Sequence, residues 1–401
     1  MSTIEQTSNE VSTNGLSRRH FIQAAAATGV AVPFAQMIGG SSVGAAGKVF
    51  RYAAQAQEGP ACPWMTKGGS LGILNAVGSW LCDVAPSGEL KPSVAKSWKG
   101  SNGGSTWTFN LRDDVTFHDG SAMSADDVVY TVNSHLDKAN KSQSAARIAD
   151  VAACVKVNAT TVRFDLKSAN ANFPFAVSSS NYGLLIMKNG EKGDESWIKK
   201  MNGSGKWILV SHKVNEKTVF KRNPNYFDKA LIPSFETMEQ IQYVSQSAAI
   251  PALKTGKLDS IHLLYGNEAD TLPKAKFYKT LVPTCGGLHM HMRADIGQLT
   301  DKRVREAIAL TLDRTAYIKG VLGGYALIAN DSVMDSFPTA DKSVPQRKKD
   351  IARAKALLAE AGVPNGFKVT LQSWKRDDID KFTQFVKSRS EEHTSELQSR
   401  F

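Results

Sequence analysis

Residues 106–128 read TWTFNLRDDVTFHDGSAMSADDV, and this stretch decides the fold. Thr106–Arg112 alternates apolar and polar residues, which predicts a half-buried strand. Val115–His118 predicts that the strand resumes, and Asp119-Gly120 predicts a tight turn because glycine tolerates a positive φ. Ser124, ahead of early acidic residues and three valines, predicts a helix N-cap. The stretch therefore predicts strand, turn, strand, tight turn and capped helix.

The flanking segments extend this pattern. Pro92–Trp98 is joined to the strand at 106 by the glycine-rich residues 99–105, which predicts a hairpin. Val49–Ala53 alternates and predicts a first strand. Further along, apolar residues recur at 304, 308, 312 and 316, which predicts a helix capped by Thr300 and ended by Gly323-Gly324. Asp350 is expected to cap the next helix, which Gly362 would end.

These motifs carry a family resemblance. In order and spacing, Pro92–Trp98 and residues 106–128 closely resemble the signature of the family 5 extracellular solute-binding proteins of ABC importers, which include dipeptide-, oligopeptide- and nickel-binding proteins. The resemblance spans about residues 48–388. Further similar segments are 202–207, 220–227, 252–259, 304–314 and 350–362. The sequence departs from the family pattern at Asp113-Asp114 and at Lys206-Trp207.

The resemblance implies an α/β, bilobal periplasmic-binding-protein fold (type II, large peptide-binding class), with the second lobe incomplete. It implies a first lobe over residues 47–285, with an inserted subdomain at about 85–200. Residues 286–388 would begin the second lobe.

Both ends of the chain are expected to lie outside the fold. Arg18-Arg19, followed by an aromatic residue and the apolar stretch Ala24–Ala35, predicts a twin-arginine signal peptide over residues 1–46. Residues 389–399 read RSEEHTSELQS, which is similar to a translated sequencing adapter, so residues 389–401 are expected to be a non-native tail.

Composition narrows the class of protein. The 401 residues carry a net charge of +11, but the basic residues are scattered and do not alternate with aromatic ones, which argues against nucleic-acid binding. No apolar run reaches the roughly 18 residues that span a bilayer. The four cysteines are too few for a disulfide scaffold and lack metal-ligand spacing. They predict buried free thiols or at most one bridge, for which Cys62–Cys82 is the only pair close in sequence.

No catalytic constellation is present. The motifs GxSxG, GxxxxGK[ST] and HExxH are all missing. His118-Asp119 is interpreted as part of a hairpin turn. His289 and His291 alternate with two methionines, so they would share one face of a strand. They could ligate a transition metal, but a strand with one polar face is the favoured interpretation. We therefore expect no enzyme activity, no cofactor and no metal.

The candidate solute contacts come from the resemblance and from positions near predicted element ends. Two follow the first strand, where the family's chain enters the cleft, and four lie near other element ends: Gln57, Glu58, Trp80, Tyr265, Asn267 and Trp374. For each of them, an ordinary core or surface residue is the favoured interpretation. An acidic partner for a peptide ammonium is expected in the part of the second lobe that the chain lacks.

The sequence thus predicts a monomeric, periplasmic binding component that delivers di- or oligopeptides to the transmembrane subunits of an ABC permease. A metal chelate, an opine or an oligosaccharide is the alternative ligand. A periplasmic enzyme or a chaperone-like protein is the alternative from another class.

Overall fold

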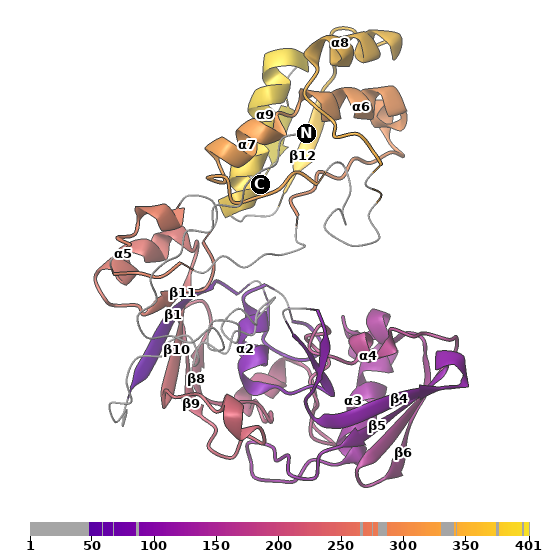
Figure 1. Cartoon of the computed structure of the whole chain (residues 1–401), viewed down its shortest axis with the longest axis vertical. Helices are drawn as coiled ribbons and strands as arrows, with labels where there is room; N and C mark the ends of the chain where they lie inside the picture. The colour runs from indigo at the N-terminus through magenta and orange to yellow at the C-terminus, as the bar shows by residue number, and fades with distance from the viewer. Residues whose placement is uncertain are drawn as a thin grey trace. The chain divides into compact units, whose positions relative to one another are not determined.

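The computed structural model describes residues 48–400 except 58, 67, 86–87, 265–267, 275, 280–286, 330–340, 342, 374–376 and 395–396. The predicted signal peptide therefore lies outside the described residues. The chain forms two compact units (Figure 1). Unit 1 runs to Val244 and includes Lys257–Ser260; unit 2 comprises Ser245–Gly256 and the chain from Ile261 onward. The predicted lobe boundary at 285/286 stays a prediction.

The first core of unit 1 is built on a five-stranded sheet of order β11-β1-β10-β9-β8. The strands are β1 (Val49–Gln55), β8 (Trp207–Lys213), β9 (Lys217–Arg222), β10 (Thr237–Tyr243) and β11 (Ser260–Ile261). β1 and β10 run parallel, whereas β10–β9 and β9–β8 are antiparallel. Helix α2 (Ser70–Val77) shares an apolar cluster with this sheet, in which the buried residues include Phe50, Ile73, Leu74, Phe220 and Met238.

The second core of unit 1 holds the stretch that decides the fold. Its antiparallel sheet has the order β4-β5-β7-β6, with β4 (Ala95–Ser101), β5 (Thr106–Leu111), β6 (Val151–Asn158) and β7 (Thr161–Leu166). Helix α3 (Ala125–Leu136) packs against β6 and β7 (Figure 1). The side chains of Phe109 and Phe164 meet edge to face at 5.4 Å within this core. The short elements β2 (Cys82–Val84), β3 (Leu90–Pro92) and α4 (Phe173–Ala176) complete it.

The predicted hairpin and the predicted cap are confirmed. β4 pairs with β5 in antiparallel register, and Ser124 and Asp127 form a capping box at the start of α3. The prediction that the strand resumes over Val115–His118 was wrong. This segment forms only an isolated antiparallel bridge between Thr116 and Ala122, because the turn at Gly120 follows too closely for a ladder.

Unit 2 has a helical core. Its elements are α5 (Ile250–Lys254), α6 (Lys302–Thr311), α7 (Arg314–Gly320), α8 (Ile351–Glu360) and α9 (Asp377–Thr394), with β12 (Val369–Gln372) parallel to β13 (Leu397–Arg400). α6 and α8 bury Val304, Ala307, Leu310, Ala354, Leu357 and Leu358 between them.

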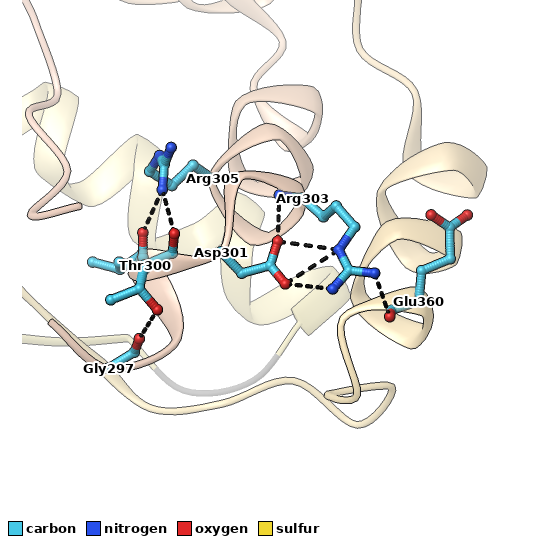
Figure 2. A network of polar contacts seen from close by, with 7 residues as sticks. Gly297, Thr300, Asp301, Arg303, Arg305 and Glu360 are labelled. Carbon is cyan, nitrogen blue, oxygen red and sulfur yellow. Dashed lines mark hydrogen bonds and ion pairs between the residues drawn. The ribbon is translucent and has the colours of Figure 1, made fainter. Parts of the chain in front are cut away.

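The cap of α6 differs from the prediction. Asp301, not Thr300, accepts from the Arg303 backbone N–H at 2.8 Å, and the Arg303 guanidinium folds back onto the same carboxylate (Figure 2). Thr300 Oγ1 instead donates to the Gly297 carbonyl. Arg303 also donates to the Glu360 carbonyl at 2.7 Å, which ties α6 to the end of α8. Asp350 caps α8 as predicted, by accepting from Arg353 N.

The predicted long helix after residue 300 is two helices. α6 ends at Thr311, the chain is extended at Leu312, and Asp313 caps α7. A new N-cap aspartate inside the apolar periodicity explains the break, since it offers the backbone N–H groups of α7 an acceptor. Ala316, expected in the buried stripe, is exposed.

The predictions about the cysteines and about membrane-spanning segments can be compared with the described residues. Cys62, Cys82 and Cys154 are free and buried, whereas Cys285 lies outside the described residues. Across the residues described here, no helix is both long and apolar enough to cross a membrane.

Candidate functional site

The carboxyl ends of β1 and β10 lie side by side in unit 1, because these two strands are parallel from Val49↔Thr237 to Gln55↔Tyr243. Solutes bind outside the carboxyl ends of strands in open α/β sheets, because the loops there are free to carry binding groups. Gln57, one of the predicted contacts, follows β1 at this edge.

Gln57 is held from two sides. Its backbone N–H donates to Asn215 Oδ1 at 2.7 Å, from the turn between β8 and β9. Its side-chain Nε2 donates to Ser70 Oγ at 3.3 Å, and Ser70 Oγ in turn donates to the Gly59 carbonyl. The side chain is buried, and its Oε1 makes no hydrogen bond among the described residues. Gln57 is therefore held in place, and its acceptor Oε1 is enclosed at the edge of the sheet.

The start of α2 closes one side of this edge. Gly69 occupies the N-cap position without a side-chain cap. A β-carbon at Gly69 would lie 2.2 Å from the Gln55 carbonyl oxygen, so only glycine fits against the end of β1. The first turn of α2 carries no acidic residue to face the positive end of the helix.

The buried face of β1 and β10 changes from apolar to polar toward this edge. Phe50 lies beside Met238, whereas the next pair on the same face is Tyr52 and Gln240, whose Nε2 donates to the tyrosine hydroxyl. Burial raises the pKa of Tyr52 far above its usual range, so the hydroxyl stays neutral. One step further, Gln242 is buried.

Several amide atoms at this polar end have no hydrogen-bond partner among the described residues. They are Gln57 Oε1, Gln240 Oε1, and Gln242 Nε2 and Oε1. Buried polar atoms are nearly always paired with protein, water or a ligand, so water or another polar group would pair with these atoms. We call Gln57, Gln240 and Gln242 the amide cluster.

Trp64 is a buried residue near Gln57 in the chain that sequence reasoning missed. Its backbone N–H donates to the Gly193 carbonyl, and its carbonyl accepts from Gln143 N. A β-carbon at Gly193 would lie 2.6 Å from Trp64 Nε1. The loop after β1 is thus held by two distant loops, a relation that no local sequence pattern signals.

The other predicted contacts divide into two groups. Trp80 is 3% exposed and lies in the apolar cluster with α2, where its Nε1 donates to the Asn181 carbonyl at 3.2 Å. Its contact with a solute stays a prediction. Glu58, Tyr265, Asn267 and Trp374 lie outside the described residues.

His118-Asp119 forms a turn with structural contacts. His118 Nε2 lies 3.0 Å from the Gly205 carbonyl oxygen, and burial lowers the pKa of the imidazole despite that carbonyl. Burial alone would raise the pKa of Asp119, but Lys188 at 2.7 Å and Ser121 outweigh it and hold that pKa well below its usual range. Asn202 also donates to Asp119, which fastens the turn.

A pocket of about 330 Å³ lies beside this turn. It is lined by residues of the turn and of the end of β9, including Lys221 and Arg222, and by no carboxylate. Within the part of the chain that the structure describes, no group of three or more His, Cys, Asp or Glu side chains could hold a metal ion.

Comparisons with known proteins agree with this architecture. The family model of the bacterial extracellular solute-binding proteins, family 5, matches residues 89–398. The nickel-binding periplasmic protein of Escherichia coli K12 is 30% identical over 288 residues, which cover 69% of this chain and 53% of that protein. The periplasmic murein peptide-binding protein MppA of the same strain is 27% identical over 311 residues, which cover 69% of this chain and 55% of that protein. The chain spans about half the length of the curated relatives that it matches.

Solved structures share the fold. NikZ from Campylobacter jejuni, in complex with Ni(L-His), superposes with a TM-score of 0.77 at 21% identity, over 88% of this chain and 73% of that one. DppA from Helicobacter pylori, in complex with peptide STSA, superposes with a TM-score of 0.74 at 21% identity, over 89% of this chain and 74% of that one. The type II periplasmic-binding-protein fold predicted from the sequence is thereby confirmed.

Proposed function

Because this chain belongs to the bacterial extracellular solute-binding proteins of family 5, we propose that it is the solute-binding component of an ABC importer and that it binds peptides. The observation that carries the proposal is the amide cluster at the carboxyl ends of β1 and β10 in unit 1.

The chemistry of the cluster suits peptide bonds. A peptide backbone presents N–H donors and carbonyl acceptors in alternation, and a carboxamide side chain supplies one of each. Among the described residues, the cluster has unpartnered acceptors on Gln57 and Gln240 and both an unpartnered donor and an unpartnered acceptor on Gln242. None of these groups carries a charge, so the cluster pairs with neutral amides without the cost of an unpaired buried ion.

In the proposed function, the protein binds a peptide without cleaving it. The protein takes up a peptide reversibly and passes it intact to the transmembrane subunits of an ABC permease. Gln57 contacts the solute, and Glu58, Tyr265, Asn267 and Trp374 remain predicted contacts.

We further propose that the protein works in the periplasm as a monomer, exported by the twin-arginine route. The support is the Arg18-Arg19 pair with the apolar segment Ala24–Ala35. Replacement of both arginines by lysine should retain the protein in the cytoplasm, whereas accumulation in the periplasm at the normal level would contradict this route.

The experiment that tests the function is a ligand screen on the full chain by thermal shift, followed by calorimetric titration. Di-, tri- and oligopeptides are compared with a nickel chelate, an opine and an oligosaccharide. We expect saturable binding of at least one peptide, recovered unchanged by mass spectrometry. Binding only of a non-peptide ligand, or cleavage of the bound peptide, would overturn the proposal.

A further inference from the structure

Residues 287–293 of unit 2 carry two histidines that the proposed function does not use. Exposure alternates along this segment: His289 and His291 are exposed, and Met290 and Met292 are half-buried. Met292 packs against the core formed by α6 and α8. The segment has no regular strand pairing, yet it keeps the alternation that the sequence predicts, with the methionines toward the protein and both imidazoles toward solvent.

The two imidazole rings lie close enough to share one ion. Their centroids are 6.3 Å apart, and the ring planes are inclined by 59°. A transition-metal ion bound to imidazole nitrogen at about 2.0–2.1 Å would lie about 3.2 Å from each centroid. Two rings on one ion can therefore be separated by up to about 6.4 Å, when the two nitrogens lie on opposite sides of the ion.

The surroundings permit a cation at this position. The neighbouring guanidinium of Arg293 is neutralised by Asp295 through two contacts, at 2.8 and 2.6 Å. Gly287 leaves room for the ring of His289, since a β-carbon there would lie 2.6 Å from His289 Nε2. Among the described residues, no third His, Cys, Asp or Glu completes a cluster with the two imidazoles.

We propose that His289 and His291 together bind one divalent transition-metal ion, with one imidazole nitrogen each. Imidazole ligands suit Cu²⁺, Ni²⁺ and Zn²⁺, whereas Mg²⁺ and Ca²⁺ prefer oxygen. Cu²⁺ binds most tightly of these ions. The site lies on unit 2 and does not depend on the proposed peptide binding in unit 1.

The test is a titration of the full chain, prepared without a polyhistidine tag, with CuSO4 and then NiCl2. Calorimetry gives stoichiometry and affinity, and electron paramagnetic resonance of bound Cu²⁺ reports the coordinating nitrogens. We expect one tight Cu²⁺ equivalent with two imidazole nitrogens, unaffected by excess Mg²⁺. His289→Ala and His291→Ala should each weaken binding by about tenfold or more.

Two further variants keep the outcome decisive. His212→Ala removes a histidine of β8 in unit 1, whose Nδ1 lies 2.9 Å from Thr218 Oγ1, and should leave the Cu²⁺ affinity unchanged. Gly287→Ala keeps both imidazoles but displaces the ring of His289, so it should weaken binding less than either histidine variant. Unchanged Cu²⁺ affinity in the double variant His289→Ala/His291→Ala, or a spectrum without two imidazole nitrogens in the wild type, would overturn the proposal.

Discussion

The two cores of unit 1 are built differently. The four-stranded core centres on Phe109, Phe164 and Phe173, which are in mutual contact, and the buried carboxylate of Asp127 in the adjoining helix α3 accepts three hydrogen bonds. The five-stranded core is apolar only at one end and reaches the amide cluster at the other. We therefore expect the four-stranded core to contribute more to stability than the polar end of the five-stranded core, where buried amide atoms lack partners among the described residues.

The largest expected effect is the loss of the aromatic centre of the four-stranded core. Phe109 is fully buried and contacts two other phenylalanines. Phe109→Ala should lower the free energy of unfolding by about 3–5 kcal/mol, because it removes apolar burial and leaves a cavity. Urea denaturation measures the loss. A loss below about 1 kcal/mol would show that this core is not the main source of stability.

The pH dependence of stability tests the same core. His135 is fully buried, its Nδ1 lies 2.6 Å from Ser142 Oγ, and burial lowers its pKa to about 3. Between that value and the ordinary value near 6.5, the unfolded chain binds the proton and the folded chain does not. Stability should therefore be complete above about pH 6.5 and fall as the pH falls toward 3.

The comparison that isolates this histidine is His135→Gln, which cannot titrate. The free energy of unfolding of the variant should depend less on pH between about 6.5 and 4 than that of the wild type. At pH 4 the difference in this dependence should reach up to about 3 kcal/mol. Parallel pH profiles of the two proteins would show that His135 does not cause the acid sensitivity.

The capping box of α3 offers a matched pair of variants. Asp127 is buried and accepts from Ser124 N and Asn189 N at 2.7 and 2.8 Å, whereas its neighbour Asp126 forms an exposed pair with Lys156. Asp127→Ala should cost about 2 kcal/mol, because buried donors lose their acceptor. Asp126→Ala should change stability by less than about 0.5 kcal/mol. Equal effects in thermal denaturation would contradict the assigned cap.

The smallest effect on stability is expected for a substitution in the amide cluster. Unlike the substitutions above, it should not lower the free energy of unfolding. Gln242→Met replaces an unpartnered buried amide by an apolar side chain, so stability should stay unchanged or rise by up to about 1 kcal/mol. Peptide affinity should fall by about tenfold if the amide pairs with the solute. Met238→Leu, on the same face of β10, is the control that should change neither quantity appreciably.

Sequence patterns predicted the elements whose signals are local. The alternation of Thr106–Arg112, the cap at Ser124 and the cap at Asp350 depend on neighbouring residues, and the structure confirms them. The break between α6 and α7 was missed because the apolar period continues past Asp313, which nonetheless caps a new helix.

The candidate site was predictable only in part. The position of Gln57 after the first strand predicted that it follows the carboxyl end of that strand, where the structure places it, whereas its contact with a solute stays a prediction. The amide cluster was not predictable, because it depends on the parallel register of Tyr52 with Gln240 and on the turn that brings Asn215 to Gln57, about 160 residues apart in the chain. Trp64 was missed for the same reason, since its partners come from distant loops.

The measurement that tests the central claim most directly is hydrogen–deuterium exchange of the full chain with and without a peptide found in the ligand screen. The account predicts slower exchange on peptide binding in the segments that contain Gln57 and Gln242. Protection confined to other parts of the chain, with these two segments unchanged at saturating peptide, would contradict the assignment of solute binding to the carboxyl ends of β1 and β10.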